Sequence, residues 1–345
     1  MKKNITIAFV FVIIMIICGC SKEKLTIYTW DEMFPQEILR GFEKETGIRI
    51  IYTNFDTNET MLARLHAAKG GDYDLIIADD YIIELAVTEK LVQKLDMSKL
   101  SNFRNINPVY QGQFYDPADE YTVPYGAGVQ TIVYDPRRVK IKITGYEDLW
   151  DESLVNSVGI IGNFRVINGM VLKLFGESYN TNDIDLIRFA GIFLHELAPN
   201  IRLIRDDRLE EELLSGEISA AVMYTSQVTM AKMEDPELEV VFPKEGIGFG
   251  IMAGFIPVNA PNPNAAHAFL NYILNAQRGA ECFEYLGYYS TYSASDPLIA
   301  VEFKEFLTLP EGFNADMEMI QNISPQAEEA HNLIWTQFRA AAGHQ

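Results

Sequence analysis

The stretch from Tyr73 to Asp79, YDLIIAD, constrains the fold of this chain more than any other feature. It is nearly continuous in apolar residues, and such a run is typical of a strand buried on both faces of a parallel sheet. Parallel strands need a long crossover between them, usually a helix. The residues before this run supply that crossover, so the sequence predicts an α/β fold.

Strand and helix patterns alternate from residue 25 onward. A strand at 25–29 is followed by an amphipathic helix at 35–47, a second strand at 48–55 and a second helix at 58–71. Apolar side chains recur at helical spacing in the first helix, and a glycine ends it. We therefore expect right-handed crossovers between parallel strands in this part of the chain.

Glycines then punctuate two extended runs that lie far apart in the sequence. The first run covers 122–135, and the second covers 242–258 and contains four glycines. Strand and helix patterns alternate again between them, over 158–224, which predicts a second α/β unit. We expect the two runs to cross between the units. Two further helices are predicted at 262–279 and 323–341.

The N-terminus, residues 1–20, reads as a secretory signal. Two lysines precede an apolar run from Ile5 to Ile17, and small residues follow it. The apolar run is too short for a comfortable spanning helix. The sequence ICGC, which ends at Cys20, resembles the lipobox of bacterial lipoproteins. That resemblance implies cleavage before Cys20 and lipid attachment there, whereas a plain cleaved signal is the alternative.

The composition excludes several classes of function. The net charge is −20, so phosphate backbones would be repelled and nucleic acid is not an expected partner, whereas cationic ligands are attracted. The chain has three cysteines, of which Cys282 alone lies beyond residue 20, so we expect no disulfide framework. The five histidines form no H-x-x-x-H pair and no nucleophile elbow is present. We therefore expect no metal, no cofactor and no enzymatic activity.

A chain-long family likeness can be read from several ordered stretches. LTIYTWDEMFPQEILRGFEKETGIRIIYTNF and GDYDLIIADDYIIELAVTEKLVQKLDMSKLSNFRNINP resemble the substrate-binding proteins of bacterial polyamine ABC importers, of the spermidine/putrescine type. YTVPYGAG, SGEISAAVMYTS, FPKEGIGFGIMAGFIPVNAPN and LGYYSTYSAS continue the likeness in the same order. The resemblance implies an extracytoplasmic carrier, in the periplasm or lipid-anchored at the outer face of the cytoplasmic membrane. Its partner would be a membrane permease driven by a cytoplasmic ATPase.

The same resemblance implies the two-lobed periplasmic binding protein fold of type II. Each lobe would be a mainly parallel sheet flanked by helices, with the ligand in the cleft and a hinge that closes over it. The first lobe would comprise 25–127 and 253–293, and the second 128–252 and 294–345. We expect a monomer.

A polyamine requires carboxylates for its ammonium groups and aromatic faces for its charged nitrogens and methylenes. By resemblance, Trp30 is an aromatic wall and Glu32 an acid, while Tyr224 stands where the family has Trp. Asp79 stands at a position that is usually Ser. The expected ligand-binding residues are Trp30, Asp31, Glu32, Asp79, Asp80, Tyr81, Tyr125, Asn163, Tyr224 and Tyr288.

The chain departs from the family in the second lobe. Asn163 and Val166 stand where two family acids are expected, and a third acid position falls near Met252. If the ligand is a polyamine, the first-lobe acids must compensate for these losses. Otherwise the ligand has a single amine or is not a polyamine. Arg165, if it faces the cleft, favours a ligand with a carboxylate.

Several of these residues have plainer explanations. Trp30 and the tyrosines can be packed core residues. Asp31 and Glu32 can be charges at the start of a helix, and Asp79 and Asp80 can cap one.

Two other functions stay open on the same fold. Tyr288, Tyr289 and Tyr292 are of the type that binds ferric iron, since hard oxygen ligands suit that ion. A sensor that presents its ligand to a receptor is the other alternative.

Overall fold

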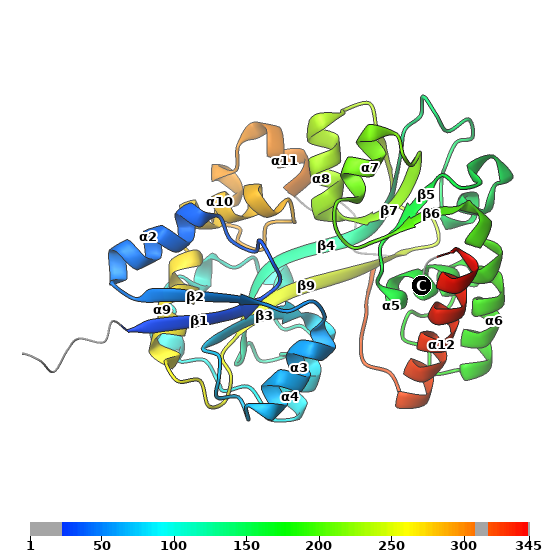
Figure 1. Cartoon of the computed structure of the whole chain (residues 1–345). Helices are drawn as coiled ribbons and strands as arrows, with labels where there is room; N and C mark the ends of the chain where they lie inside the picture. Colours follow the sequence, from blue (N-terminus) through cyan, green and yellow to red (C-terminus); the bar gives the residue numbers. More distant parts are fainter. Residues whose placement is uncertain (1–22, 308–316, 344–345) are drawn as a thin grey trace, which may run out of the picture.

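The computed structural model describes residues 23–307 and 317–343 (Figure 1). The predicted signal at 1–20 and the lipidation site Cys20 lie outside these ranges, so both stay predictions. Within the described ranges, no helix combines the length and the apolar character that a bilayer crossing requires.

The first lobe contains the predicted alternation of strands and helices. Its strands β1 (Lys24–Thr29), β2 (Arg49–Asn54) and β3 (Leu75–Asp79) are parallel and lie in the order β2-β1-β3. The first four residues of β3 are fully buried, which confirms the prediction from their continuous apolar run. The helices that cover this sheet are α2 (Gln36–Thr46), α3 (Asn58–Ala67) and α4 (Asp80–Thr88).

Two long antiparallel strands cross between the lobes. They are β4 (Thr122–Tyr134) and β9 (Ile247–Phe255), at the positions that the glycine-containing runs predict. β9 also pairs with β3, and β4 continues to β7, so one sheet runs in the order β2-β1-β3-β9-β4-β7-β5-β6. Near the middle of the crossing, Gly128 lies opposite Gly250. At this point of the crossing, therefore, the two strands face each other without side chains.

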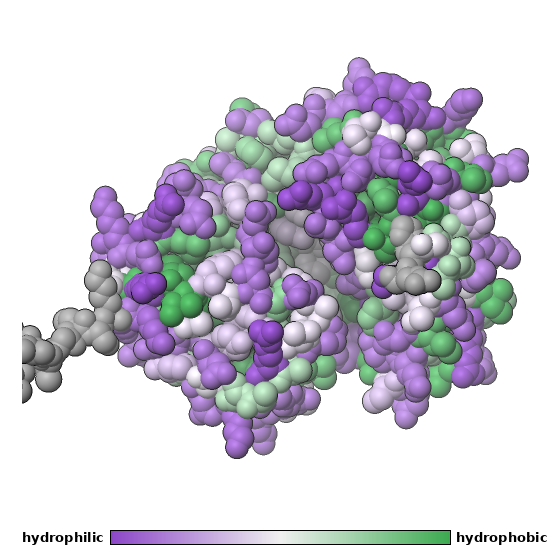
Figure 2. Space-filling view, viewed as in Figure 1, coloured by the Kyte–Doolittle hydropathy of each residue, from purple (hydrophilic) through white to green (hydrophobic). Residues whose placement is uncertain are grey.

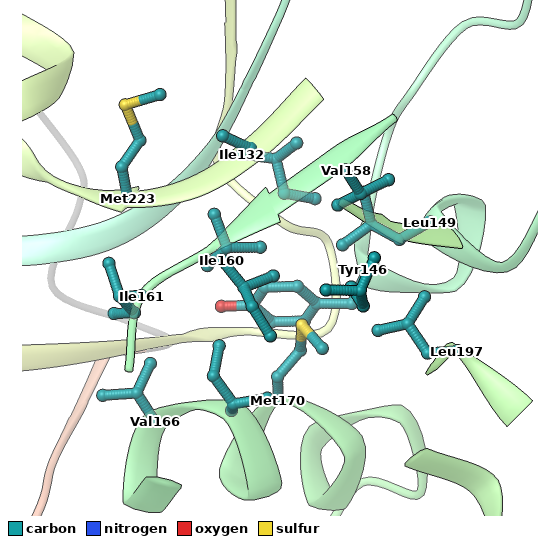
Figure 3. Packing of buried hydrophobic residues seen from close by; sticks show 14 of the residues in the cluster. Ile132, Tyr146, Leu149, Val158, Ile160, Ile161, Val166, Met170, Leu197 and Met223 are labelled. Atoms are coloured by element: carbon teal, nitrogen blue, oxygen red, sulfur yellow. The ribbon is translucent and has the colours of Figure 1, made fainter. Parts of the chain in front are cut away.

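The second lobe repeats the α/β arrangement around its own core. Its strands are β5 (Val158–Ile160), β6 (Ile201–Ile204), β7 (Ala220–Tyr224) and β8 (Glu239–Val241). Its helices are α5 (Phe164–Leu174), α6 (Ile184–Glu196), α7 (Leu209–Ser215), α8 (Thr225–Glu234) and α12 (Pro325–Ala341). Figure 3 shows Val166 and Met170 of α5 pointing toward Ile160 and Ile161, which fixes this helix against the sheet.

The remaining elements are α9 (Pro263–Ile273), α10 (Ala276–Leu286), α11 (Val301–Leu307) and β10 (Met317–Met319). Short 3-10 turns lie at Met97–Lys99, Phe103–Asn105, Pro108–Tyr110, Tyr146–Trp150, Glu152–Leu154, Ala198–Asn200 and Asp296–Leu298. The single helix predicted at 262–279 is two helices. Asn275 interrupts it, because its side chain accepts hydrogen bonds from two backbone N–H groups and caps the second helix.

The hydrophobic cores follow the two lobes. One cluster joins residues 132–238 to 320–338, and two others join residues 25–129 to 247–307. The predicted segment 294–345 is divided, since Ile299 and Leu307 pack in a first-lobe cluster whereas α12 packs in the second lobe. Figure 2 shows the surface hollowed where the two bodies meet. This arrangement confirms the predicted α/β fold with two lobes.

Candidate functional site

Asp79 lies at the carboxyl end of β3, which is where open α/β sheets bind their ligands. It occupies the N-cap position of α4, but its side chain makes no capping hydrogen bond. Instead, its Oδ2 atom accepts a hydrogen bond of 2.8 Å from Nδ2 of Asn58, and Trp30 donates a second one. Helix capping therefore does not explain this residue, because its carboxylate bonds to Asn58 and Trp30 and not to the backbone of α4.

The surroundings of the Asp79 carboxylate favour the binding of a cationic group. Burial raises the pKa of its carboxyl from 3.8 to about 6, and the charge of Glu59 adds to the rise. No Lys, Arg or His in the described part of the chain forms an ion pair with it. A desolvated carboxylate without a counter-ion is costly, and a bound ammonium group removes that cost.

Tyr81 and the start of α3 complete this part of the site. The Tyr81 hydroxyl accepts a hydrogen bond of 3.0 Å from Nδ2 of Asn58 and donates one of 3.1 Å to Glu59. One amide group therefore holds both Asp79 and Tyr81 in place. Sequence reasoning missed Asn58 and Glu59. Their position after β2, at the same edge of the sheet as Asp79, is the signal that could have found them.

Asp80 faces the crossing strand β9 and not the cleft, which corrects the expectation that it binds the ligand. Its carboxyl is buried and accepts hydrogen bonds from the N–H groups of Ile251 (3.0 Å) and Tyr81 (2.8 Å). Burial, and to a lesser degree the charge of Asp79, raises its pKa to about 8. Along one edge of β9, β10 pairs with Ile247 to Phe249 and β3 pairs from Met252 onward. Asp80 occupies the gap between them, where it bonds to Ile251.

Trp30 is half-buried, and its ring lies 4.5 Å from that of Phe55, centroid to centroid. The next two residues, Asp31 and Glu32, are exposed, and α2 begins only at Gln36. They are therefore not in the first turn of that helix. Glu32 has a φ of 52°, in the left-handed region that is costly for a residue with a side chain. Such strain often marks a functional turn.

The acids of this turn are set apart from Asp79. Asp31 accepts hydrogen bonds from Asn54 (2.5 Å) and from the N–H of Glu32 (3.0 Å). Both acids act on Tyr52, whose pKa is raised first by burial and then by their charges. Within the described residues, neither acid forms a hydrogen bond with Asp79. The two acids are therefore exposed side chains tied to Asn54 and Tyr52.

The second lobe contributes Tyr224, which ends β7 at the equivalent sheet edge. The side chain of Asn163 forms a hydrogen bond with Tyr224 and also caps α5, accepting from the N–H groups of Arg165 (3.1 Å) and Val166 (3.2 Å). Asn163 is thus a support for the Tyr224 ring. The pKa of Tyr224 is raised well above 10, by burial and then by several negative charges that include Asp79 of the other lobe.

Tyr288 lies over Gly128 of the crossing strand β4. A Cβ atom placed on Gly128 would lie 2.9 Å from Cδ1 of the Tyr288 ring, so the ring covers the glycine. Its hydroxyl forms a hydrogen bond with Ser226, while burial and the charges of Asp79 and Asp206 raise its pKa to about 12. Tyr224 and Tyr288 therefore lie within electrostatic range of the same two carboxylates.

Asp206 is a site residue that sequence reasoning missed. It follows β6, and its Oδ1 atom accepts a hydrogen bond of 2.9 Å from the N–H of Gly162. Its side chain is exposed to water, yet burial of its surroundings raises its pKa, as expected for a carboxylate in a cleft wall. The strand before it, 201–204, is the signal that could have found it. That strand has four residues and mixes apolar with charged side chains, so its periodicity does not identify it.

Tyr125 is a core residue, which corrects the expectation that it binds the ligand. It is fully buried, its hydroxyl donates a 2.8 Å hydrogen bond to the carbonyl of Met33, and its ring packs against Phe34 at 4.8 Å. The tyrosines expected of a ferric site, Tyr288, Tyr289 and Tyr292, do not share one cluster. Tyr292 is buried in the same core as Tyr125, whereas Tyr289 belongs to a separate one.

Arg165 is structural. It is 6% exposed, and its guanidinium donates to Glu328 (3.2 Å) and to the carbonyls of Tyr179 (3.2 Å) and Gln321 (3.2 Å). These bonds hold α5 to the segment before α12. The argument from Arg165 for a ligand with a carboxylate therefore falls away. Val166, at one of the missing acid positions, packs in the core in Figure 3.

The chain is similar to known transport proteins over most of its length. Residues 37–298 match the family of bacterial extracellular solute-binding proteins. The chain is 34% identical to the spermidine/putrescine-binding periplasmic protein of Salmonella typhimurium over 285 residues, 81% of each chain. It is 27% identical to the putrescine-binding periplasmic protein of Escherichia coli over 344 residues, 93% of each chain.

A solved structure agrees with these matches. The spermidine/putrescine ABC transporter substrate-binding protein of Streptococcus pneumoniae superposes with a TM-score of 0.81 at 27% identity, covering 93% of this chain and 99% of the other. The predicted periplasmic binding protein fold is thereby confirmed. With the family match over three quarters of its residues, the chain belongs to the bacterial extracellular solute-binding protein family.

Proposed function

We propose that this protein captures a polyamine of the putrescine or spermidine type outside the cytoplasm and delivers it to an ABC permease. The observation that carries the proposal is Asp79, a desolvated carboxylate with no cationic partner in the described residues, close to aromatic side chains. The names of the relatives support the same ligand class. The family groups solute-binding transport proteins and is not an enzyme class.

The proposed site takes its parts from both lobes. Trp30, Asp79 and Tyr81 come from the first lobe, Tyr224 comes from the second with Asn163 behind it, and Tyr288 lies at the hinge. The carboxylate offsets the charge of an ammonium group, and each ring face adds about 0.5–2 kcal/mol of cation–π attraction. Asp31 and Glu32 would serve as outer charges that raise the local concentration of the cation.

Closure follows from contact with both lobes at once. A ligand that touches only the first lobe has no differential affinity for the closed form, whereas one that also contacts Tyr224 does. The strands β4 and β9 provide the hinge, with Gly128 opposite Gly250. The closed form is then the species that the permease binds.

The location of the protein is part of the proposal. Cleavage before Cys20 and lipid attachment there would hold a monomer at the outer face of the cytoplasmic membrane. The negative charge of the chain disfavours nucleic acid as a partner.

A thermal-shift experiment tests the ligand class. The purified protein is melted with putrescine, cadaverine, spermidine, spermine, amino acids and ferric citrate in turn. A ligand at 100 times its dissociation constant stabilises the folded form by about 2.7 kcal/mol, which raises the melting temperature by several degrees. A rise with one or more polyamines is the expected result. If only amino acids or ferric citrate raise it, the proposal is refuted.

A further inference from the structure

In the second lobe, the carboxylate of Asp206 is held by a backbone hydrogen bond and forms no ion pair with the described residues. Asp206 lies beside Tyr224, and a single side chain ties the two together. The Nε2 atom of Gln227 donates to the carbonyl of Asp206 (3.2 Å), and the Oε1 atom of the same amide accepts from the N–H of Tyr224 (3.2 Å). Gly162, which donates to the Asp206 carboxylate, directly precedes Asn163, the support of the Tyr224 ring.

The bases nearest to Asp206 in sequence are all engaged elsewhere. Arg205 pairs with Asp207 (3.2 Å) and Glu212 (3.0 Å), and Arg208 lies 3.9 Å from Glu211. Among the described residues, the N–H of Gly162 donates the hydrogen bond that holds the Asp206 carboxylate (2.9 Å). The neighbouring Asp207 thus carries a neutralised charge, whereas Asp206 does not.

Asp79 has the same property in the first lobe, and both carboxylates act on the same two rings. Gln227 ties Asp206 to Tyr224, and the charges of Asp79 and Asp206 both act on the Tyr224 and Tyr288 rings, so this aromatic pair lies near one acid from each lobe. Beside Asp79, the buried Oδ1 atom of Asn58 accepts no hydrogen bond from the described residues. It is a further acceptor for a donor that the protein itself does not supply.

We infer that Asp206 anchors one ammonium group of the ligand from the second lobe while Asp79 anchors another from the first. The preferred ligand then carries two cationic nitrogens joined by an apolar chain, which lies along Tyr224 and Tyr288. This inference rests on the proposed function and assigns the second charge to a residue that the family resemblance does not supply.

The arrangement also links ligand charge to closure. Bringing Asp79 and Asp206 toward each other without a ligand is opposed by their mutual repulsion. A dication removes this repulsion at both ends, whereas a monoamine neutralises one end only. The closed form is therefore favoured by diamines and longer polyamines over monoamines.

Calorimetric titration with two ligands of equal chain length tests the inference. Putrescine and 1-aminobutane differ by one amine, and each is titrated into the wild-type protein, D206N and D207N. Loss of a hydrogen-bonded charge partner should weaken putrescine at least ~30-fold in D206N, whereas 1-aminobutane changes little because it leaves one anchor unused. The preference for putrescine over 1-aminobutane should therefore shrink in D206N. It should stay unchanged in D207N, whose charge is paired with Arg205.

The outcomes separate the inference from the proposed function. If putrescine binds the wild type and D206N binds it equally well, the inference fails while the proposed function stands. If D206N weakens both amines by the same factor, the effect is structural, and the inference fails in the same way. If the wild type binds no amine at all, the proposed function and the inference fall together. A melting temperature of ligand-free D206N that is no lower than that of the wild type shows that the loop is intact.

Discussion

Asp79 predicts a pH dependence of ligand binding that follows from its surroundings. Its carboxyl has a pKa of about 6 in the ligand-free protein, because burial and the charge of Glu59 disfavour the ionised form. An ammonium group binds the ionised form only, and amines stay protonated throughout this range. About nine tenths of Asp79 is ionised at pH 7 and about one tenth at pH 5, so the affinity should fall about tenfold between them.

The sign of the stability effect is opposite to that of the binding effect. The folded pKa of Asp79 lies above its value of 3.8 in an unfolded chain, so its ionised form destabilises the fold at pH 7. The cost is at most about 3 kcal/mol and disappears as the pH falls from 6 toward 4. Asp79→Asn should therefore raise the stability of the ligand-free protein at pH 7 while it abolishes tight binding of putrescine.

Two measurements check this pair of effects. Calorimetric titration of putrescine between pH 5 and pH 7.5 gives the affinity, and urea unfolding without ligand at pH 4 and pH 7 gives the stability. The wild type should lose affinity toward low pH, whereas D79N should be weak and nearly independent of pH. The reasoning is refuted if wild-type affinity is the same at pH 5 and pH 7, or if D79N keeps the wild-type slope.

Three further substitutions separate the cleft from the core and the hinge. Gly128→Ala should weaken ligand binding at least ~10-fold in calorimetric titration. Its Cβ would lie only 2.9 Å from Cδ1 of Tyr288, so the ring would have to move. Tyr125→Phe should cost about 0.5–1.5 kcal/mol in urea unfolding, through loss of the hydrogen bond to Met33, with ligand affinity unchanged. Glu32→Gln should weaken putrescine less than Asp79→Asn does; a larger loss in E32Q would return Glu32 to the centre of the site.

Strong local patterns made the fold predictable. The buried run of β3, the stop of α2 at Gly47 and the glycine-containing crossings each follow from a local rule, and the structure confirms them. β6 escaped prediction because four residues carry too little periodicity. The break at Asn275 escaped because a capping side chain inside an apolar helical pattern is ambiguous until the two halves are seen to pack separately.

Only the site residues that lie at the ends of predicted strands could be predicted from the sequence. Asp79 and Tyr224 are the last residues of β3 and β7, so strand positions alone bring them to the cleft. Asp80 and Tyr125 are of the right chemical type but face the hinge and the core, which depends on side-chain direction that sequence does not carry. Asp206 was not predicted because β6, the strand that it follows, was not predicted either.

The binding residues and the hinge are parts of one assembly. The Tyr288 ring covers Gly128, which lies opposite Gly250 in the crossing strands. Ile251 follows Gly250 and donates its N–H to Asp80, the first residue of the helix that Asp79 precedes. A shift of the first lobe around β9 therefore moves Asp79 and the Tyr288 ring relative to Tyr224. Because binding and closure use the same contacts, a substitution at the hinge changes affinity even when it touches no ligand atom. The reduced affinity expected for Gly128→Ala tests this coupling directly.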